Sequence, residues 1–278
     1  MFKDMLVHLD GTDGDEVRLQ YAEPIASTFD AYLTGVLVNE IPEVMIAGDP
    51  SISAAQVVVD LQNEAVTKGD QALDKLKGRF SRLGVGNELR RIDVYSSRAG
   101  ALLAAEARMG DIFVATRPYG HSGEGSASIL EAALFDSGRG MLFVPPEGSA
   151  PAEYETILLA WQNTREAARA VADAMPFLTR AKKVIVAIVD EAGPVEQRGL
   201  EPGADIARHL DRHGVNVELR HVEDWQRTSD ALLNEVAKSG AQMVVMGGYG
   251  HSRFREWILG GTTRDILGKA TVPVLVAH

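Results

Sequence analysis

The part of the sequence best suited to chemistry is a run of small residues near the C-terminal end. It consists of two glycine clusters separated by a short segment: Gly247, Gly248 and Gly250, then nine residues, then Gly260, Gly261, Thr262 and Thr263. Glycine lets the backbone turn sharply and lets a phosphate approach bare N–H groups, and a helix that starts there adds its dipole. The threonine hydroxyls could add further donors. The pattern predicts a phosphate-binding loop, although the same glycines could serve only a turn and a close helix contact.

Other phosphate and catalytic patterns are absent from the sequence. There is no G-x-x-x-x-G-K-[ST], no G-x-G-x-x-G after the first strand of either half, no H-E-x-x-H, no G-x-S-x-G and no cysteine. These absences disfavour a kinase, a P-loop ATPase and an NAD dehydrogenase. The sequence therefore favours binding over catalysis, and we expect a protein that is not an enzyme.

The elements that would position these glycines alternate between short apolar runs and longer helical segments, as βαβ units on a parallel sheet do. Five strands are expected in the first half: Met5–Leu9, Ala31–Val38, Glu88–Tyr95, Ile112–Ala115 and Met141–Val144. Five more are expected in the second: Thr156–Trp161, Val184–Val189, Val215–His221, Met243–Met246 and Val272–Val276. Two pairs of expected helices also match, Asp13–Thr28 with Thr164–Leu178 and Ala99–Met109 with Ser229–Ser239. The second helix differs between the halves, because Ser51–Leu83 is long and Gly203–His213 is short.

The two halves also share a tetrapeptide. Tyr-Gly-His-Ser follows the fourth expected strand in each half, at residues 119–122 and 249–252. This repeat favours duplication, and the segment Pro145–Pro151 has the composition of a linker. We therefore expect two domains, residues 1–146 and 152–278, with one ten-stranded domain as the alternative.

Composition limits the partners. The 278 residues carry a formal net charge of -11, without a Lys/Arg run that could attract a nucleic acid, so none is expected as a partner. The chain has no cysteine, and no apolar run approaches the ~20 residues of a membrane span. We expect a cytoplasmic protein that does not enter a membrane.

The glycine pattern resembles that of a known family. Gly247-x-x-Gly250, nine residues, Gly260 and the final run Pro273–Val276 look like the signature and last strand of the universal stress protein family. The resemblance implies an α/β fold of two tandem five-stranded parallel sheets in the order 3-2-1-4-5, with helices on both faces and a pseudo-two-fold relation. It also implies an adenine nucleotide (ATP, ADP or AMP, with Mg²⁺ as an accompanying ion) across the carboxyl ends of the strands.

The sequence departs from the family pattern in both halves. Gly261 stands where the family has Ser or Thr, which shifts a hydroxyl contact to Thr262, and Gln162 stands where nucleotide-binding relatives carry Asp. An amide can still hydrogen-bond a sugar or a base. The first half keeps the Asp as Asp10, but its loop contains Pro118, which removes a backbone donor. We therefore expect a nucleotide site only in the second half: Gly247, Gly248, Gly250, His251, Gly260, Gly261, Thr262, Thr263 and Gln162, with no catalytic or metal-binding residue.

Some of these residues have a second interpretation. His251 titrates near neutrality and could touch a phosphate, but a loop histidine is usually solvated. Asp10 could contact a nucleotide or a metal, or simply form a turn and helix cap before Gly11. Arg98, Arg117 and Arg139 could form an anion site in the first half, or lie on the surface.

The sequence leads to three hypotheses about function and one about how the two halves pair. The first function is adenine-nucleotide binding with a regulatory role in the stress response, exerted through partners; the alternatives are an interaction scaffold without nucleotide and a very slow ATPase. The apolar fifth strands, Met141–Val144 and Val272–Val276, would leave open edges if each half stood alone. Because a short linker favours intramolecular contact, we expect these strands to pair within one chain. A homodimer or a regulatory protein partner is compatible with this pairing.

Overall fold

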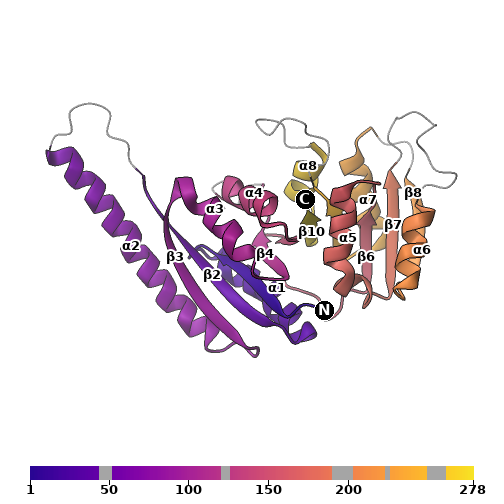
Figure 1. Ribbon diagram of the computed structural model, residues 1–278, viewed down its shortest axis with the longest axis horizontal. Helices are drawn as coiled ribbons and strands as arrows, with labels where there is room; N and C mark the ends of the chain where they lie inside the picture. Colours follow the sequence, from indigo (N-terminus) through magenta and orange to yellow (C-terminus); the bar gives the residue numbers. More distant parts are fainter. Residues whose placement is uncertain (44–51, 120–125, 190–202, 223–225, 249–260) are drawn as a thin grey trace.

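The computed structural model describes residues 1–43, 52–119, 126–189, 203–222, 226–248 and 261–278 (Figure 1). The first half has nine elements: β1 (Asp4–Leu9), α1 (Gly14–Phe29), β2 (Tyr32–Ile41), α2 (Ile52–Phe80), β3 (Asn87–Tyr95), α3 (Ser96–Ala107), β4 (Ile112–Thr116), α4 (Ala127–Ser137) and β5 (Met141–Val144). The second half repeats this order: β6 (Thr156–Ala160), α5 (Arg165–Leu178), β7 (Lys183–Val189), α6 (Ala204–Arg212), β8 (Val217–Val222), α7 (Thr228–Ser239), β9 (Met243–Gly247), α8 (Gly261–Lys269) and β10 (Val274–Ala277).

All ten strands form one sheet in the order β3-β2-β1-β4-β5-β10-β9-β6-β7-β8. Within each half the pairings are parallel and the order is 3-2-1-4-5, so the fold predicted from the sequence is confirmed. The two halves meet at the fifth strands, where β5 and β10 pair antiparallel with Leu142 opposite Leu275. Figure 1 shows the halves diverging from this seam.

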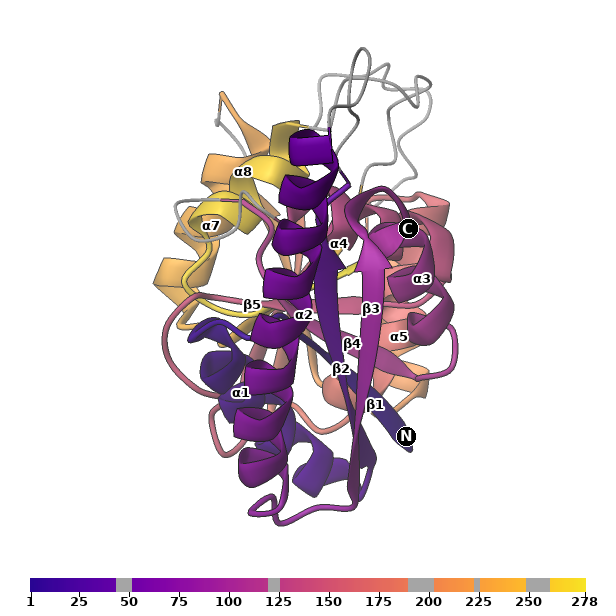
Figure 2. The ribbon, with the colours of Figure 1, turned by 90° about the vertical axis from the view of Figure 1, so that its left-hand side faces the viewer.

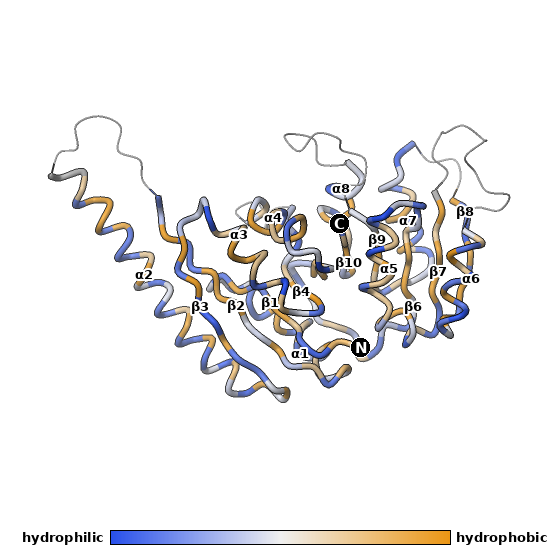
Figure 3. The backbone as a smooth tube through the Cα atoms, in the orientation of Figure 1, coloured by the Kyte–Doolittle hydropathy of each residue, from blue (hydrophilic) through white to orange (hydrophobic). Residues whose placement is uncertain are grey.

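The sequence pattern explains why the central strands lie inside. Parallel strands covered by helices on both faces are apolar along their whole length, and the strands β4, β5, β9 and β10 have buried residues at nearly every position. In Figure 3 the backbone tube is coloured as hydrophobic along much of β6, β7 and β9. The outer strand β3 is only partly buried, and the long helix α2 lies across it (Figure 2).

Two hydrophobic cores cover the two faces of the sheet. One core contains residues of α1, α2, α5 and α6, and the other contains residues of α3, α4, α7 and α8. Each core includes residues from both halves, so neither face is interrupted at the seam. The predicted helices on both faces are thereby confirmed.

Side chains from each half also reach across the seam. Arg117 donates from Nη1 to the carbonyl oxygen of Ala270 at 2.9 Å, and Arg169 donates from Nη2 to that of Gly138 at 2.8 Å. The aromatic rings of Phe29 and Phe177 meet edge to face, with centroids 5.3 Å apart. The fifth-strand pairing expected from the sequence is therefore confirmed and is accompanied by contacts from the flanking helices.

Several element boundaries differ from the expected ones. The second strand runs on to Ile41 because its residues from Leu33 onward pair with β3, as far as Ile41 opposite Tyr95. Val215 lies before β8 and is buried as an anchor of the preceding turn, with its N–H bonded to the carbonyl of Leu210. The division into domains at residues 146 and 152 stays a prediction. Among the described residues, no helix is both long and apolar enough to cross a membrane.

The first prediction concerns the seam. Leu275 is fully buried in β10, so Leu275→Asp places a charge in the core between the halves. We expect the free energy of unfolding in urea to fall by at least about 3 kcal/mol, since an unpaired buried charge is among the most costly changes. Leu61→Asp is the control, because Leu61 is 40% exposed on α2. An equal loss for both variants would contradict the role given to the seam.

Candidate functional site

The carboxyl ends of β6 and β9 form the edge at which the sequence places the nucleotide. These strands are neighbours, with Ala160 opposite Met246. Gln162 follows β6 and is exposed, while Gly247 ends β9 and Gly248 follows it. In an open α/β sheet, ligands bind at the carboxyl ends of strands where the strand order reverses. β6 and β9 are the parallel first and fourth strands of this half, and the strand order reverses between them, because β7 and β8 lie on one side and β9 and β10 on the other.

Gly247 permits a close contact between strand and helix. A Cβ at this position would lie 2.5 Å from the backbone nitrogen of Ala167 and 2.7 Å from the carbonyl carbon of Glu166. Both atoms belong to the first turn of α5, whose N-cap Thr164 accepts a hydrogen bond from Ala167 N–H at 3.2 Å. Gly247 therefore serves packing, the structural alternative that the sequence left open.

Gly248 and the start of α8 lie side by side. A Cβ at Gly248 would be 3.8 Å from Cγ2 of Thr263, and the Gly248 N–H donates to the carbonyl of Ala277 at 2.9 Å. A Cβ at Gly261 would meet nothing within 4 Å among the described residues. The N-terminus of α8, which is the positive end of its dipole, is thus placed next to the end of β9.

The two threonines of this helix differ in exposure. Thr263 is 4% exposed, whereas Thr262 is half-buried. Thr262 is therefore the hydroxyl that a ligand at the helix start could reach. Gly250, His251 and Gly260 lie outside the described residues.

The first half has a cleft at the equivalent edge. Its volume is ≈ 830 Å³, and it is lined by residues from β1, the β1–α1 loop, α1, β2 and β4. Its charged lining residues are Asp10, Asp13, Arg18 and Glu40. Since three carboxylates face one guanidinium there, the described lining is net negative and disfavours a polyanionic ligand.

Arg18 is the centre of a buried charge network beside this cleft. Its side chain is 3% exposed, and its Nη2 lies 2.6 Å from Asp10 Oδ1 and 2.5 Å from Asp15 Oδ1. Its Nη1 donates to Thr116 Oγ1 at 2.8 Å, which ties α1 to the end of β4. The second carboxylate, Asp15, also accepts the N–H groups of Asp10 and Gly11 at 3.0 Å each. The network thus fixes the β1–α1 loop.

The charges of this network determine how its members titrate. Burial raises the pKa of Asp10, but the Arg18 charge and hydrogen bonds from Thr12 and Arg18 outweigh it and bring the pKa to about 2. Burial and the Arg18 charge together lower the pKa of His8 to about 4, so that this buried histidine is neutral at physiological pH. Asp10 also accepts hydrogen bonds from the backbone N–H and the hydroxyl of Thr12, as in an Asx-turn.

Two of the three arginines expected as a second anion site, Arg117 and Arg139, make contacts elsewhere. Arg117 reaches across the seam, and Arg139 donates from Nη2 to the carbonyl of Arg108 at 3.3 Å. Sequence reasoning missed Arg18 and Asp15, although their spacing of three residues on an otherwise apolar helix face was a usable signal. No group of three or more His, Asp or Glu side chains in the described ranges is arranged to hold a metal ion.

The fold is a doubly wound α/β architecture, built twice in one chain. Comparison with family models finds a match in the second half. Residues 153–278 match the model of the Universal stress protein family, and the resemblance inferred from the sequence is confirmed.

Solved structures extend the likeness to the whole chain. A universal stress protein from Archaeoglobus fulgidus is similar with a TM-score of 0.72 at 16% identity, covering 99% of this chain and 95% of that one. A functionally unknown protein from Pseudomonas aeruginosa gives a TM-score of 0.59 at 16% identity, with 99% and 92% covered. At this identity the likeness concerns the fold, and it supports a tandem arrangement. No curated protein sequence matches the chain.

Two glycines of the same motif give the second prediction. Gly247→Ala should lower the free energy of unfolding by about 1–3 kcal/mol, because its Cβ would press on the rigid backbone of α5. Gly261→Ala should change it by less than about 1 kcal/mol, or raise it, because the site is open and alanine favours a helix. Urea unfolding of both variants tests this, and a reversed order would show that the glycines have other roles.

The third prediction concerns Arg18. Arg18→Met should cost about 3–5 kcal/mol at neutral pH, because it leaves buried carboxylates without a cation. In the wild type, the low pKa of Asp10 contributes stability above pH 3.8 that is lost only as the pH falls towards 2. In the variant, burial raises the carboxyl pKa values, so its penalty should shrink as the pH falls from 7 towards about 4. Chemical unfolding across this pH range measures the difference in free energy of unfolding between the wild type and the variant, with Arg18→Lys as the charge-preserving control. A difference that does not change with pH would rule out the electrostatic cause.

Proposed function

We propose that this chain binds an adenine nucleotide, ATP, ADP or AMP with Mg²⁺ as an accompanying ion, in its second half, and that the bound form regulates protein partners in the cytoplasm during stress. The observation that carries the proposal is the start of α8 beside the end of β9, where Gly248 lies next to Thr263 and no described residue crowds Gly261. The family match over residues 153–278 supports the same half.

Each described residue of the site has a role in this proposal. The N–H groups at the start of α8 and the hydroxyl of Thr262 would donate to phosphate oxygens, which the helix dipole also favours. The amide of Gln162, across the edge on the β6 side, would hydrogen-bond the sugar or the base. Gly247 would act indirectly, by letting α5 approach β9. No described group is placed as a general base, which supports binding rather than hydrolysis.

Only one nucleotide per chain is proposed. The equivalent edge of the first half holds the Arg18 network, whose guanidinium is already shared by two carboxylates. Asp13 and Glu40 add further negative charge to the cleft. A triphosphate would meet repulsion there, whereas the start of α8 offers a positive dipole end.

The fourth prediction tests this by calorimetric titration with ATP, ADP and AMP, with and without Mg²⁺. We expect about one nucleotide bound per chain. Gly261→Trp should abolish binding, because its open position lets a large ring occupy the helix start without a clash in the core. Gly84→Trp is the matched control, since Gly84 is equally open but lies in the first half.

A second pair of variants separates the two threonines. Thr262→Ala should weaken binding by about three- to tenfold, the value of one hydrogen bond, while Thr263→Ala should leave the affinity unchanged because its side chain is buried. If millimolar nucleotide produces no heat with the wild type, the nucleotide proposal fails and an interaction scaffold becomes the better explanation.

A further inference from the structure

Helix α8, whose N-terminal end forms part of the proposed nucleotide site, packs against a residue of the first half. The Cζ atom of Arg264, in the first turn of α8, lies 5.3 Å from the centre of the Tyr119 ring, which is a cation–π contact across the seam. One turn further along, a Cβ at Gly268 would lie 3.8 Å from Cβ of Tyr119. Tyr119 belongs to the first copy of the repeated tetrapeptide, which the nucleotide proposal leaves without a role. This copy therefore contacts two successive turns of α8.

The C-terminal end of α8 is held by a second residue of the same loop. Arg117 donates from Nη1 to the carbonyl oxygen of Ala270, the residue that follows α8, at 2.9 Å. A cation is favourable there, because the C-terminal end of a helix is the negative end of its dipole. The backbone of Arg117 is itself fixed, since its N–H donates to the carbonyl of Val144 at the end of β5 at 3.1 Å. The loop between β4 and α4 thus holds α8 near both ends.

Helix α4 of the first half supports both described walls of the proposed site. Glu131 accepts a hydrogen bond from the Tyr119 hydroxyl. Phe135 follows four residues later, on the same face of α4, and its ring packs edge to face against that of His278 with centroids 4.7 Å apart. The Nδ1 atom of His278 donates to the carbonyl of Gly248 at 3.2 Å. One face of α4 therefore reaches α8 through Tyr119 and the end of β9 through His278.

We propose that Tyr119 and Phe135 of the first half are positioning residues for the phosphate site of the second half and set its affinity for phosphate groups. This inference rests on the nucleotide function proposed above. A phosphate held between the start of α8 and the end of β9 needs these two segments at a fixed spacing, and a site that is already in that arrangement loses less free energy on binding. Tyr119 fixes α8, and Phe135 fixes Gly248 through His278. The first half, which binds no nucleotide in this proposal, thus controls the site of the second half.

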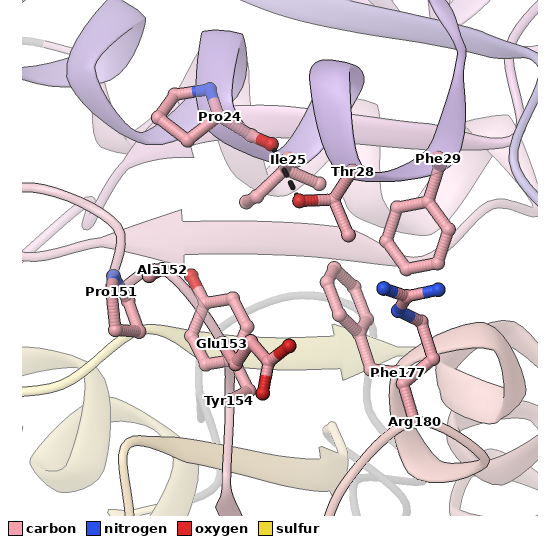
Figure 4. Close-up of a pocket in the computed structure, with 10 residues that line it drawn as sticks. All are labelled: Pro24, Ile25, Thr28, Phe29, Pro151, Ala152, Glu153, Tyr154, Phe177 and Arg180. Carbon is pink, nitrogen blue, oxygen red and sulfur yellow. Dashed lines mark hydrogen bonds between the residues drawn. The ribbon is translucent and has the colours of Figure 1, made fainter.

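The opposite edge of the seam provides a control, because the two halves also pack there. At the amino edge of the sheet, a cavity of ≈ 280 Å³ lies between the ends of α1 and α5, with Thr28 and Arg180 among its lining residues (Figure 4). Its walls also include Phe29 and Phe177, whose rings meet edge to face, and Tyr154, whose hydroxyl is buried. These phenylalanines belong to the core on the face of the sheet opposite α4 and α8. Phe29→Ala therefore weakens the seam without removing a contact to α8.

The fifth prediction compares ATP with adenosine, which lacks phosphates, in calorimetric titrations of the full-length variants, with saturation-transfer NMR for weak binding. Tyr119→Ala removes the ring beside Arg264, and Phe135→Ala removes the ring beside His278. Each should weaken ATP binding by about five- to tenfold, the lower part of the range for coupling between sites, and leave adenosine unchanged. Tyr119→Phe keeps the ring and should bind ATP within about twofold of the wild type. Phe29→Ala should bind ATP as the wild type does.

The outcomes separate this inference from the function on which it rests. Phe135 is 37% exposed, so Phe135→Ala removes little buried surface, and circular dichroism confirms that each variant is folded. If the wild type binds no nucleotide, the proposed function fails and this inference fails with it. If the wild type binds ATP and both alanine variants, Tyr119→Ala and Phe135→Ala, bind it equally well, the nucleotide function stands and the inference is overturned. An equal loss for Phe29→Ala, or equal losses of ATP and adenosine, would overturn it as well, because either shows a general loosening of the halves.

Discussion

The antiparallel ladder between β5 and β10 is the interaction on which the architecture depends. Each half alone would end its parallel sheet in a short apolar edge strand with unpaired N–H and C=O groups, which is a template for aggregation. When β5 and β10 pair, the backbone groups of both edge strands are hydrogen-bonded and each hydrophobic core becomes continuous across the sheet. The seam also decides which helices become neighbours, and this is how the ends of α1 and α5 come to enclose a cavity that neither half contains.

The same fold carries different chemistry at its two carboxyl edges. In the first half Arg18, Asp10 and Asp15 satisfy one another, and their charges are held in place by the backbone N–H groups of the β1–α1 loop. In the second half the corresponding edge has the uncharged Gln162 and a helix start with an open glycine. A buried ion network costs desolvation energy and is stable only when every partner is present. The first half therefore has a charged edge fixed by ion pairs, whereas the described polar side chains at the second edge, Gln162 and Thr262, are uncharged.

Local patterns in the sequence predict most of the fold and only part of the sites. Apolar runs and their spacing suffice for the strands, the duplication and the fifth-strand pairing, because each depends on residues that are neighbours along the chain or recur in both halves. The strand order came from the family resemblance. For Arg18 the local spacing from Asp15 indicates a pair, but not its contact with Thr116, which is distant in the sequence. The close approach that requires Gly247 likewise depends on where α5 packs. Tyr154 lies just after the segment that reads as a linker, so nothing local indicates that its hydroxyl is buried.

Joining the two halves in one chain frees them to differ. In a symmetric dimer the same patch faces itself across the two-fold axis, so every residue of the interface appears twice. Here α1 and α5 each contain a proline, Pro24 and Pro176, but four residues further on Thr28 lies within α1, whereas Arg180 lies just after the end of α5. The connecting segment also passes along one side of the seam only and contributes Tyr154 there. A two-fold symmetric seam would have a cation on both walls and a tyrosine on neither or both. Because duplication within one chain removed this constraint, the two walls of the seam could come to differ, with Thr28 on one side and Arg180 on the other.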